Sequence, residues 1–248
     1  MKKVFISLTV FFCVVMIGFS EYYQKTETVL LVAELMAFEI EDVEENNYKS
    51  DVINTSLKNL GIVTYIDSET NQFAALGHSL MNSKEITSIN GICYDVHIDE
   101  NASYENLESS KNLGSIYMDK EKALGNIYYD SYSGIYGKIN NVDTSKYEEI
   151  ETENRYKIKT GKASILLRLD GETLESYEVE ILAINYFASN KNLRVKITDE
   201  RLINKTGGIV QGMSGTPVIQ NGKLVGAINC VNIENAQDAF AIFIDKII

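Results

Sequence analysis

The sequence is poor in several residue types. Its 248 residues include no tryptophan, one proline, two histidines and three cysteines, and 35 acidic residues outnumber 23 basic ones, for a formal net charge of −12. Neutralising a phosphate backbone requires clustered lysine and arginine, so this balance argues against nucleic acid as a partner.

The scarcity of cysteine limits disulfide and metal chemistry. Cys13 lies in an N-terminal apolar run, so only Cys93 and Cys230 could pair within a folded domain, and two free buried thiols are the simpler expectation. Neither residue has the close cysteine or histidine spacing of a zinc site. We therefore predict no metal and no other cofactor.

Sustained helical periodicity is also missing. Short apolar runs separated by Gly, Asn, Asp and Ser follow one another along the chain. The runs at 61–66 and 73–76 flank a polar turn, 193–197 alternates strictly, and Asn221-Gly222 joins two further runs in the manner of a type I′ hairpin. The pattern predicts an all-β or mostly β fold.

The N-terminus carries a targeting signal. Lys2 and Lys3 precede an apolar run over 4–19, which is typical of a signal peptide or an uncleaved signal anchor over 1–20, and either one exports the rest of the chain. Acidic residues follow, so 21–50 is predicted to be an acidic linker, although its apolar patch at 29–33 could form a strand. One folded domain is predicted over 51–248.

The strongest chemical signal is the stretch Gly212-Met213-Ser214-Gly215. Glycines on both sides of a serine allow close approach of a substrate carbonyl, and the N–H groups of Gly212 and Ser214 could converge on the oxygen that becomes negative. Ser214 is therefore the candidate nucleophile, with an oxyanion hole at Gly212 and Ser214. An ordinary glycine-rich loop before a hairpin is the alternative interpretation.

A serine nucleophile needs a base, and only His78 and His97 are available. His78 follows an apolar run and a glycine, whereas His97 lies in an alternating stretch between acidic residues, as expected of a solvated strand face. We favour His78. For the residue that orients it, the sequence offers several aspartates, among them Asp95 and Asp99.

Three ordered motifs resemble the stage IV sporulation protein B (SpoIVB) family of serine peptidases from spore-forming bacteria. They are ALGHSL, LGSIYMDKEKALGNIYYDSYSGIYGKI and ITDERLINKTGGIVQGMSGTPVIQNGKLVGA, and the similarity spans about residues 45 to 248. The resemblance implies a chymotrypsin-like double β-barrel, with His78, Asp199 and Ser214 at the positions of the catalytic triad. The space before the domain is too short for the PDZ domain that many relatives carry.

The same resemblance implies a biological setting. Such peptidases act during endospore formation by limited proteolysis between the forespore and mother-cell membranes, cleave themselves near the N-terminus, and are held to the membrane by their N-terminal segment. Protein substrates, in particular sporulation membrane proteins, are thus the expected partners. Two alternatives stay open: a catalytically silent scaffold or peptide-binding protein with a protease fold, and a cysteine hydrolase that uses Cys230.

Overall fold

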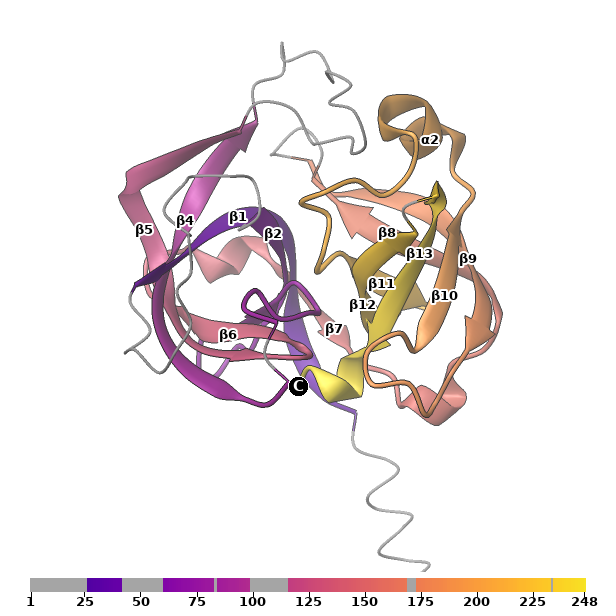
Figure 1. The fold of residues 1–248 in the computed structure, drawn as a ribbon, viewed down its shortest axis with the longest axis horizontal. Coiled ribbons are helices and arrows are strands. Elements are labelled where there is room, and N and C mark those ends of the chain that lie inside the picture. The colour runs from indigo at the N-terminus through magenta and orange to yellow at the C-terminus, as the bar shows by residue number, and fades with distance from the viewer. Residues whose placement is uncertain (1–25, 42–59, 83, 99–115, 169–172, 233) are drawn as a thin grey trace, which may run out of the picture.

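The computed structural model describes residues 26–41, 60–82, 84–98, 116–168, 173–232 and 234–248. Two antiparallel β-barrels lie side by side, the N-terminal one in indigo to magenta and the C-terminal one in orange to yellow (Figure 1). This arrangement confirms the predicted mostly β, double-barrel fold.

The first barrel is a seven-stranded sheet closed through its first two strands. Its order is β2-β3-β6-β5-β4-β1-β7, and β1 also pairs with β2. The strands are β1 (Thr28–Glu41), β2 (Leu60–Ile66), β3 (Gln72–Ala75), β4 (Thr87–Ile98), β5 (Ile116–Ser131), β6 (Gly134–Ile139) and β7 (Glu148–Glu151). A buried cluster that includes Phe38, Val63, Phe73, Ile127 and Ile135 fills this barrel.

The second barrel closes in the order β10-β13-β12-β11-β8-β9. Its strands are β8 (Gly161–Leu167), β9 (Glu175–Ile184), β10 (Leu193–Ile197), β11 (Pro217–Gln220), β12 (Lys223–Asn232) and β13 (Asn235–Phe243). Four short helices complete the described elements: α2 (Glu200–Thr206) and the 3-10 turns η2 (Thr144–Lys146), η3 (Arg155–Lys157) and η4 (Ile244–Lys246).

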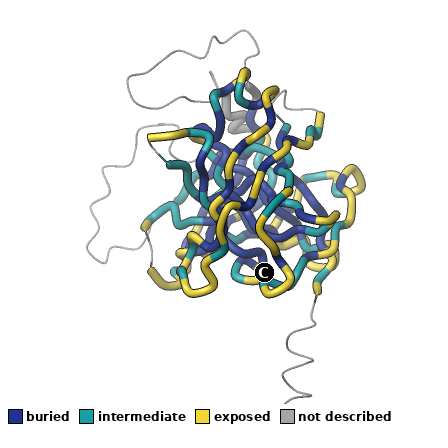
Figure 2. Tube along the Cα trace, turned by 90° about the vertical axis from the view of Figure 1, so that its right-hand side faces the viewer, coloured by how far each residue is buried: buried dark blue, intermediate teal, exposed yellow. Residues whose placement is uncertain are grey.

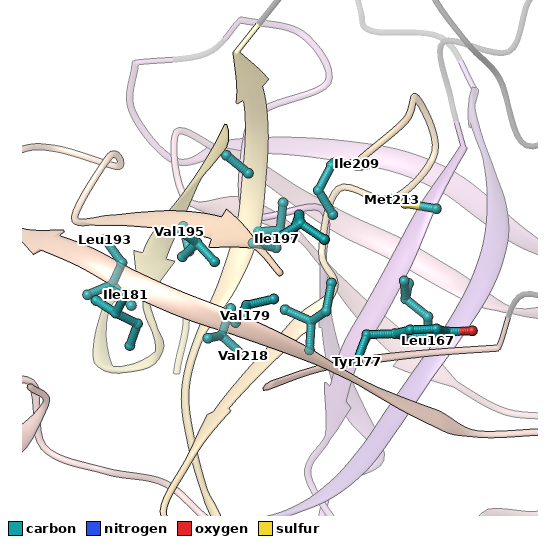
Figure 3. Close-up of a cluster of buried hydrophobic side chains, with 14 of the residues drawn as sticks. Leu167, Tyr177, Val179, Ile181, Leu193, Val195, Ile197, Ile209, Met213 and Val218 are labelled. Carbon is teal, nitrogen blue, oxygen red and sulfur yellow. The ribbon is translucent and has the colours of Figure 1, made fainter. Parts of the chain in front are cut away.

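Alternating side chains build the core of the second barrel. Tyr177, Val179 and Ile181 of β9 point inward, and their neighbours along the strand are exposed or half-buried. Figure 3 shows these residues packed with Val195 and Val218 from other strands. Met213, next to the candidate nucleophile, is fully buried in the same cluster. The burial-coloured trace shows the same contrast between buried strands and exposed connections (Figure 2).

The two hairpins read from the sequence are present. Strands β2 and β3 pair across a turn in which the Asp67 carboxylate accepts from the backbone N–H of Glu69 and Thr70. Strands β11 and β12 pair across Asn221 and Gly222, which both have positive φ, 53° and 75°. Positive φ at both central residues is the requirement of a type I′ turn.

The predicted linker over 21–50 needs correction. Residues 28–41 form β1, which pairs with β2, β4 and β7 and is therefore part of the first barrel. Glu39 and Glu41, two of the acidic residues that suggested a tether, belong to this strand. Glu34 of the same strand accepts at its carboxylate from Lys146 Nζ at 2.8 Å and from the Tyr147 hydroxyl at 2.7 Å. The folded domain thus begins before residue 51.

The proposed signal segment over 1–20 lies outside the described residues. Within the described ranges, none of the helices combines the length and apolar character that crossing a membrane requires.

Candidate active site

Ser214 lies on a tight turn between α2 and β11. Glycines on both sides of it have positive φ, 97° at Gly212 and 95° at Gly215, a conformation that other residues rarely adopt. Gly215 is further constrained by space, because a Cβ added there would lie 2.0 Å from the Ile62 carbonyl oxygen. The turn therefore requires glycine for both conformation and close approach, as the sequence motif indicated.

The amides of this turn suit the predicted oxyanion hole. Met213 N–H donates to the Val210 carbonyl at 3.1 Å and Gly215 N–H to the Ile228 carbonyl at 2.7 Å. In the part of the chain that the structure describes, no hydrogen bond engages the N–H of Gly212 or of Ser214. These two donors belong to residues that flank Met213, and both remain open to an oxyanion.

One residue of the first barrel joins the serine turn to the histidine segment. Ile62 of β2 donates its N–H to the Ser214 carbonyl at 2.7 Å and accepts at its own carbonyl from Leu76 N–H at 3.2 Å. Thr64, on the same strand, donates its hydroxyl to the Gly215 carbonyl at 2.7 Å. Two segments that lie far apart in the sequence are thus held against one strand.

The segment before His78 makes a strained turn. Gly77 N–H donates to the Ala75 carbonyl at 2.9 Å, which closes a three-residue turn around Leu76. Leu76 is fully buried and has φ of 71°, an unfavourable conformation for a bulky residue. Such strain is found chiefly at functional sites, where the surrounding structure enforces it.

The His78 ring lies between the barrels. It is half-buried, and its Nδ1 lies 3.0 Å from the Ser79 carbonyl oxygen. Because a carbonyl can only accept, this contact places a proton on Nδ1 and leaves Nε2 as the basic nitrogen. Within the described residues, no hydrogen bond joins the ring to the Ser214 hydroxyl; in free enzymes such contacts often tighten only when substrate binds.

A cavity of about 440 Å³ opens beside the ring. It is lined from the first barrel by His78, Ser79, Asn82 and Tyr132, and from the second by Asn190, Lys191, Asn229 and Cys230. Asn229 is buried and donates from Nδ2 to the Asn190 carbonyl at 2.6 Å; among the described residues, its Oδ1 has no hydrogen-bond partner.

The model of the SpoIVB peptidase S55 family matches residues 48–248. The chain belongs to this family. Comparison with curated proteins gives no match. Among solved structures, the active form of the Rv3671c protease from M. tuberculosis is similar, with 10% identity, a TM-score of 0.42, and coverage of 87% of this chain and 78% of that one. An inactive serine-to-alanine mutant of that protease gives 10% identity, a TM-score of 0.40, and coverage of 86% and 82%.

In this SpoIVB-family peptidase, the carboxylate of Asp199 is engaged at the end of a helix. It precedes α2 as its N-cap, and Oδ1 accepts from Arg201 N–H at 2.9 Å and from Arg201 Nε at 3.1 Å. Oδ2 accepts from Arg201 Nη2 at 2.8 Å and from Glu178 N–H at 3.1 Å. The bond from Arg201 lowers the pKa of the Asp199 carboxyl to about 2.

The Ser214 turn and the segment before His78 are both attached to β2, whereas Asp199 caps a helix. Among the described residues, no hydrogen bond joins the Asp199 carboxylate to the His78 ring, and Asp199 is not part of the cavity lining.

The rival residues His97 and Asp95 belong to β4 of the first barrel. His97 lies on β4 opposite Tyr117, and Asp95 on the same strand accepts from Val96 N–H at 3.0 Å. Asp99 is outside the described residues. No sequence motif marked Asn229, or Asp130, a fully buried carboxylate that contacts the segment following His78.

Cys230 lines the cavity, so its chemistry bears on the cysteine-hydrolase alternative. Both Cys230 and Cys93 are free thiols. Burial raises the pKa of the Cys230 thiol, and the neighbouring Lys191 opposes this shift only in part. A thiol with a raised pKa is a poor nucleophile at neutral pH, since the thiolate is the reactive form.

Proposed function

We propose that this serine peptidase is an endopeptidase in which Ser214 is the nucleophile and His78 the general base. His78 Nε2 takes the hydroxyl proton as Ser214 Oγ attacks the peptide carbonyl, and the carbonyl oxygen becomes an oxyanion held by Gly212 N–H and Ser214 N–H. The imidazolium then gives its proton to the leaving amine, which produces an acyl-enzyme. Water, deprotonated by His78, hydrolyses the ester and regenerates the serine.

The observation that carries this proposal is the shared attachment to Ile62. Its N–H holds the Ser214 carbonyl and its carbonyl holds the amide of Leu76, two residues before His78. Each catalytic residue comes from a different barrel, and one rigid strand fixes both. The orienting role of Asp199 is proposed from family membership alone; its carboxylate also binds Arg201 and the β9 backbone.

The biological setting is also proposed from family membership. The apolar run over 4–19 behind two lysines supports export and retention at a membrane, so the barrels would lie outside the cytoplasm. We expect limited proteolysis during endospore formation, with sporulation membrane proteins as substrates. Self-cleavage would occur in the part of the chain that precedes β1.

The proposal is tested on the full chain. Strand β1 belongs to the first barrel, and a fragment starting at residue 45 would lack it. The purified protein is treated with a fluorophosphonate probe, and self-cleavage is followed in parallel. Ser214→Ala and His78→Ala should abolish both labelling and cleavage, whereas the matched control His97→Ala should retain them.

A catalytically silent scaffold is the competing function. It predicts a folded, full-length protein that neither labels nor cuts when its membrane partners are supplied. Labelling that persists in Ser214→Ala would instead show that another nucleophile reacts. Either result would remove the proposed mechanism.

A further inference from the structure

Exposed aromatic side chains gather at one end of the second barrel. Phe187, in the loop between β9 and β10, has 99% of its surface exposed, and Tyr156 of η3 and Tyr186 are 57% and 36% exposed. The rings of Tyr156 and Tyr186 stack with centroids 5.5 Å apart, and Tyr186 stacks in turn on buried Phe243 at 5.8 Å. We call Tyr156, Tyr186 and Phe187 the aromatic patch. Exposing neighbouring apolar rings to water costs free energy, so such a patch indicates a contact surface.

The loop that carries Phe187 is braced by hydrogen bonds. Asn185 Oδ1 accepts from the N–H groups of Phe187 and Ala188, at 3.0 and 3.1 Å. Lys246 Nζ donates to the Ala188 carbonyl at 2.6 Å, and Asn192 Nδ2 donates to the same carbonyl at 2.8 Å. The exposed ring therefore sits on an ordered support, which lowers the entropy cost of a contact made through it.

The start of β1 lies at the same end of the molecule. Glu27 N–H donates to the Thr152 hydroxyl at 2.9 Å, and Thr152 N–H donates to the Glu27 carbonyl at 2.7 Å. Thr152 shortly precedes η3, which carries Tyr156. Asp245 of η4 forms an ion pair with Arg155 of η3 at 2.7 Å, and η4 also bonds the β9–β10 loop. Figure 1 shows η4 and the indigo start of β1 at the same edge of the molecule, near the label C.

A short length of chain connects this face to the N-terminal apolar run. The run over 4–19 ends eight residues before Glu27. A fully extended chain spans at most about 3.6 Å per residue, so the end of the run lies within about 29 Å of Glu27. A membrane that holds the run is therefore close to the face on which Glu27 and the aromatic patch lie.

Basic side chains accompany the aromatic ones on this face. The guanidinium carbon of Arg155 lies 5.2 Å from the centroid of the Phe243 ring, and the Lys157 side chain is 60% exposed. Their carboxylate partners, Asp245 and Glu153, leave η3 and η4 close to neutral, whereas the whole chain has a net charge of −12. Aromatic rings beside cations are typical of surfaces that lie in the headgroup region of a bilayer. The composition therefore fits lipid headgroups.

We propose that the aromatic patch docks on the membrane that holds the N-terminal segment, with Phe187 inserted between the lipid headgroups. Tyr156 and Tyr186 lie at headgroup level, where the rings contact lipid and the hydroxyl groups stay hydrated. The short connection makes this docking intramolecular, so a weak contact is sufficient to fix the orientation of the barrels. The inference rests on the membrane retention that is part of the proposed function, and it adds a second contact to it.

The test uses tryptophan fluorescence, because the sequence contains no tryptophan of its own. The full chain carries Ser214→Ala to prevent the proposed self-cleavage, together with either Phe187→Trp or the control Asn204→Trp. Asn204 is an exposed residue of α2, and β10 runs from the end of the Phe187 loop toward that helix, so the two positions lie at opposite ends of the strand. Both proteins are reconstituted in vesicles of phosphatidylcholine with acyl chains brominated near the headgroup.

The two variants should differ in their contact with lipid. Bromine quenches tryptophan only at close range, so emission from Phe187→Trp should be quenched by the brominated lipid and shifted to shorter wavelength. Emission from Asn204→Trp should instead be quenched by iodide in the surrounding water. Adding Tyr156→Ser to Phe187→Trp should reduce the quenching by lipid, because it removes one ring of the aromatic patch.

Equal quenching by lipid in the two variants, in a chain that co-sediments with the vesicles, would overturn the inference and leave membrane retention intact. Quenching of Phe187→Trp by iodide in that experiment would assign the aromatic patch to a protein partner. A shift that appears only at high protein-to-lipid ratio would assign it to a second copy of the chain, which also overturns the inference. A chain that does not co-sediment would refute both the docking and the retention.

Catalysis is measured separately by fluorophosphonate labelling of the chain with Ser214 intact. Failure to label would remove the proposed peptidase mechanism. It would leave the fluorescence result unchanged, since those variants carry Ser214→Ala.

Discussion

Replacing Gly215 by alanine tests the geometry of the proposed nucleophile turn most directly. A Cβ at this position would lie 2.0 Å from the Ile62 carbonyl oxygen and 2.7 Å from the Leu76 nitrogen, both of them backbone atoms. A carbon and a carbonyl oxygen in contact lie about 3.3 Å apart, so the turn would have to move by about 1 Å. That movement acts on the bonds from Gly215 N–H to Ile228 and from Thr64 to the Gly215 carbonyl.

Gly222→Ala supplies a matched control. Gly222 also has positive φ, 75°, but nothing lies within 4 Å of a Cβ added there. Its replacement should therefore cost only the conformational strain, about 1 kcal/mol, or roughly 2–4 °C in melting temperature for a domain of this size. Gly215→Ala carries comparable strain and adds the clash, so we expect a loss of more than about 3 kcal/mol.

The assay combines thermal unfolding with fluorophosphonate labelling at a temperature where both variants are folded. Gly222→Ala should label at the wild-type rate. Gly215→Ala should label at least about a hundredfold more slowly, because a displacement of about 1 Å misplaces the hydroxyl relative to the base. Equal melting temperatures and equal labelling rates for the two variants would show that the turn is not confined as described.

Two further predictions concern residues outside the proposed catalytic pair. Asp199→Asn should weaken the cap of α2 and its ion pair with Arg201, at a cost of about 1–2 kcal/mol at neutral pH. Because the folded pKa of Asp199 is about 2, below the unfolded value, its contribution is present above about pH 4 and is lost as pH falls toward 2. Unfolding curves of the variant and the unmodified protein should accordingly converge in acid; a constant difference would contradict this. Cys230→Ser should keep serine labelling and self-cleavage, and bulky alkylation of Cys230 in the unmodified chain should block the cavity; loss of labelling in Cys230→Ser would favour thiol chemistry.

The sequence allowed prediction of those features whose causes are local. Glycines with positive φ mark the turns at 77 and 212–215, so the turns beside His78 and Ser214 could be located from the sequence. Alternation in 193–197 and the Asn221-Gly222 pair likewise predicted strands and a hairpin that the structure contains. In each case, the residues that determine the turn or the strand are neighbours in the sequence.

Features that depend on tertiary partners were predicted poorly. Glu39 and Glu41 looked like part of a tether, because the strand that pairs with them lies far along the chain, as do the lysine and tyrosine that bind Glu34 of the same strand. Composition alone cannot distinguish an acid that faces water from one that faces Lys146 and Tyr147. The linker prediction failed for this reason.

The role of the third catalytic residue belongs to the same class of problem. Asp199 carries a clear local signal, an aspartate followed by Glu200 and a helix, and this is the signal of an N-cap, which the structure contains. Orientation of a histidine by a carboxylate, by contrast, depends on contacts between segments far apart in the chain, as the attachment of the Ser214 turn and of Leu76 to Ile62 illustrates. A local motif therefore predicts the helix cap directly, whereas the orienting role proposed for Asp199 follows only from family membership and is tested by labelling of Asp199→Asn.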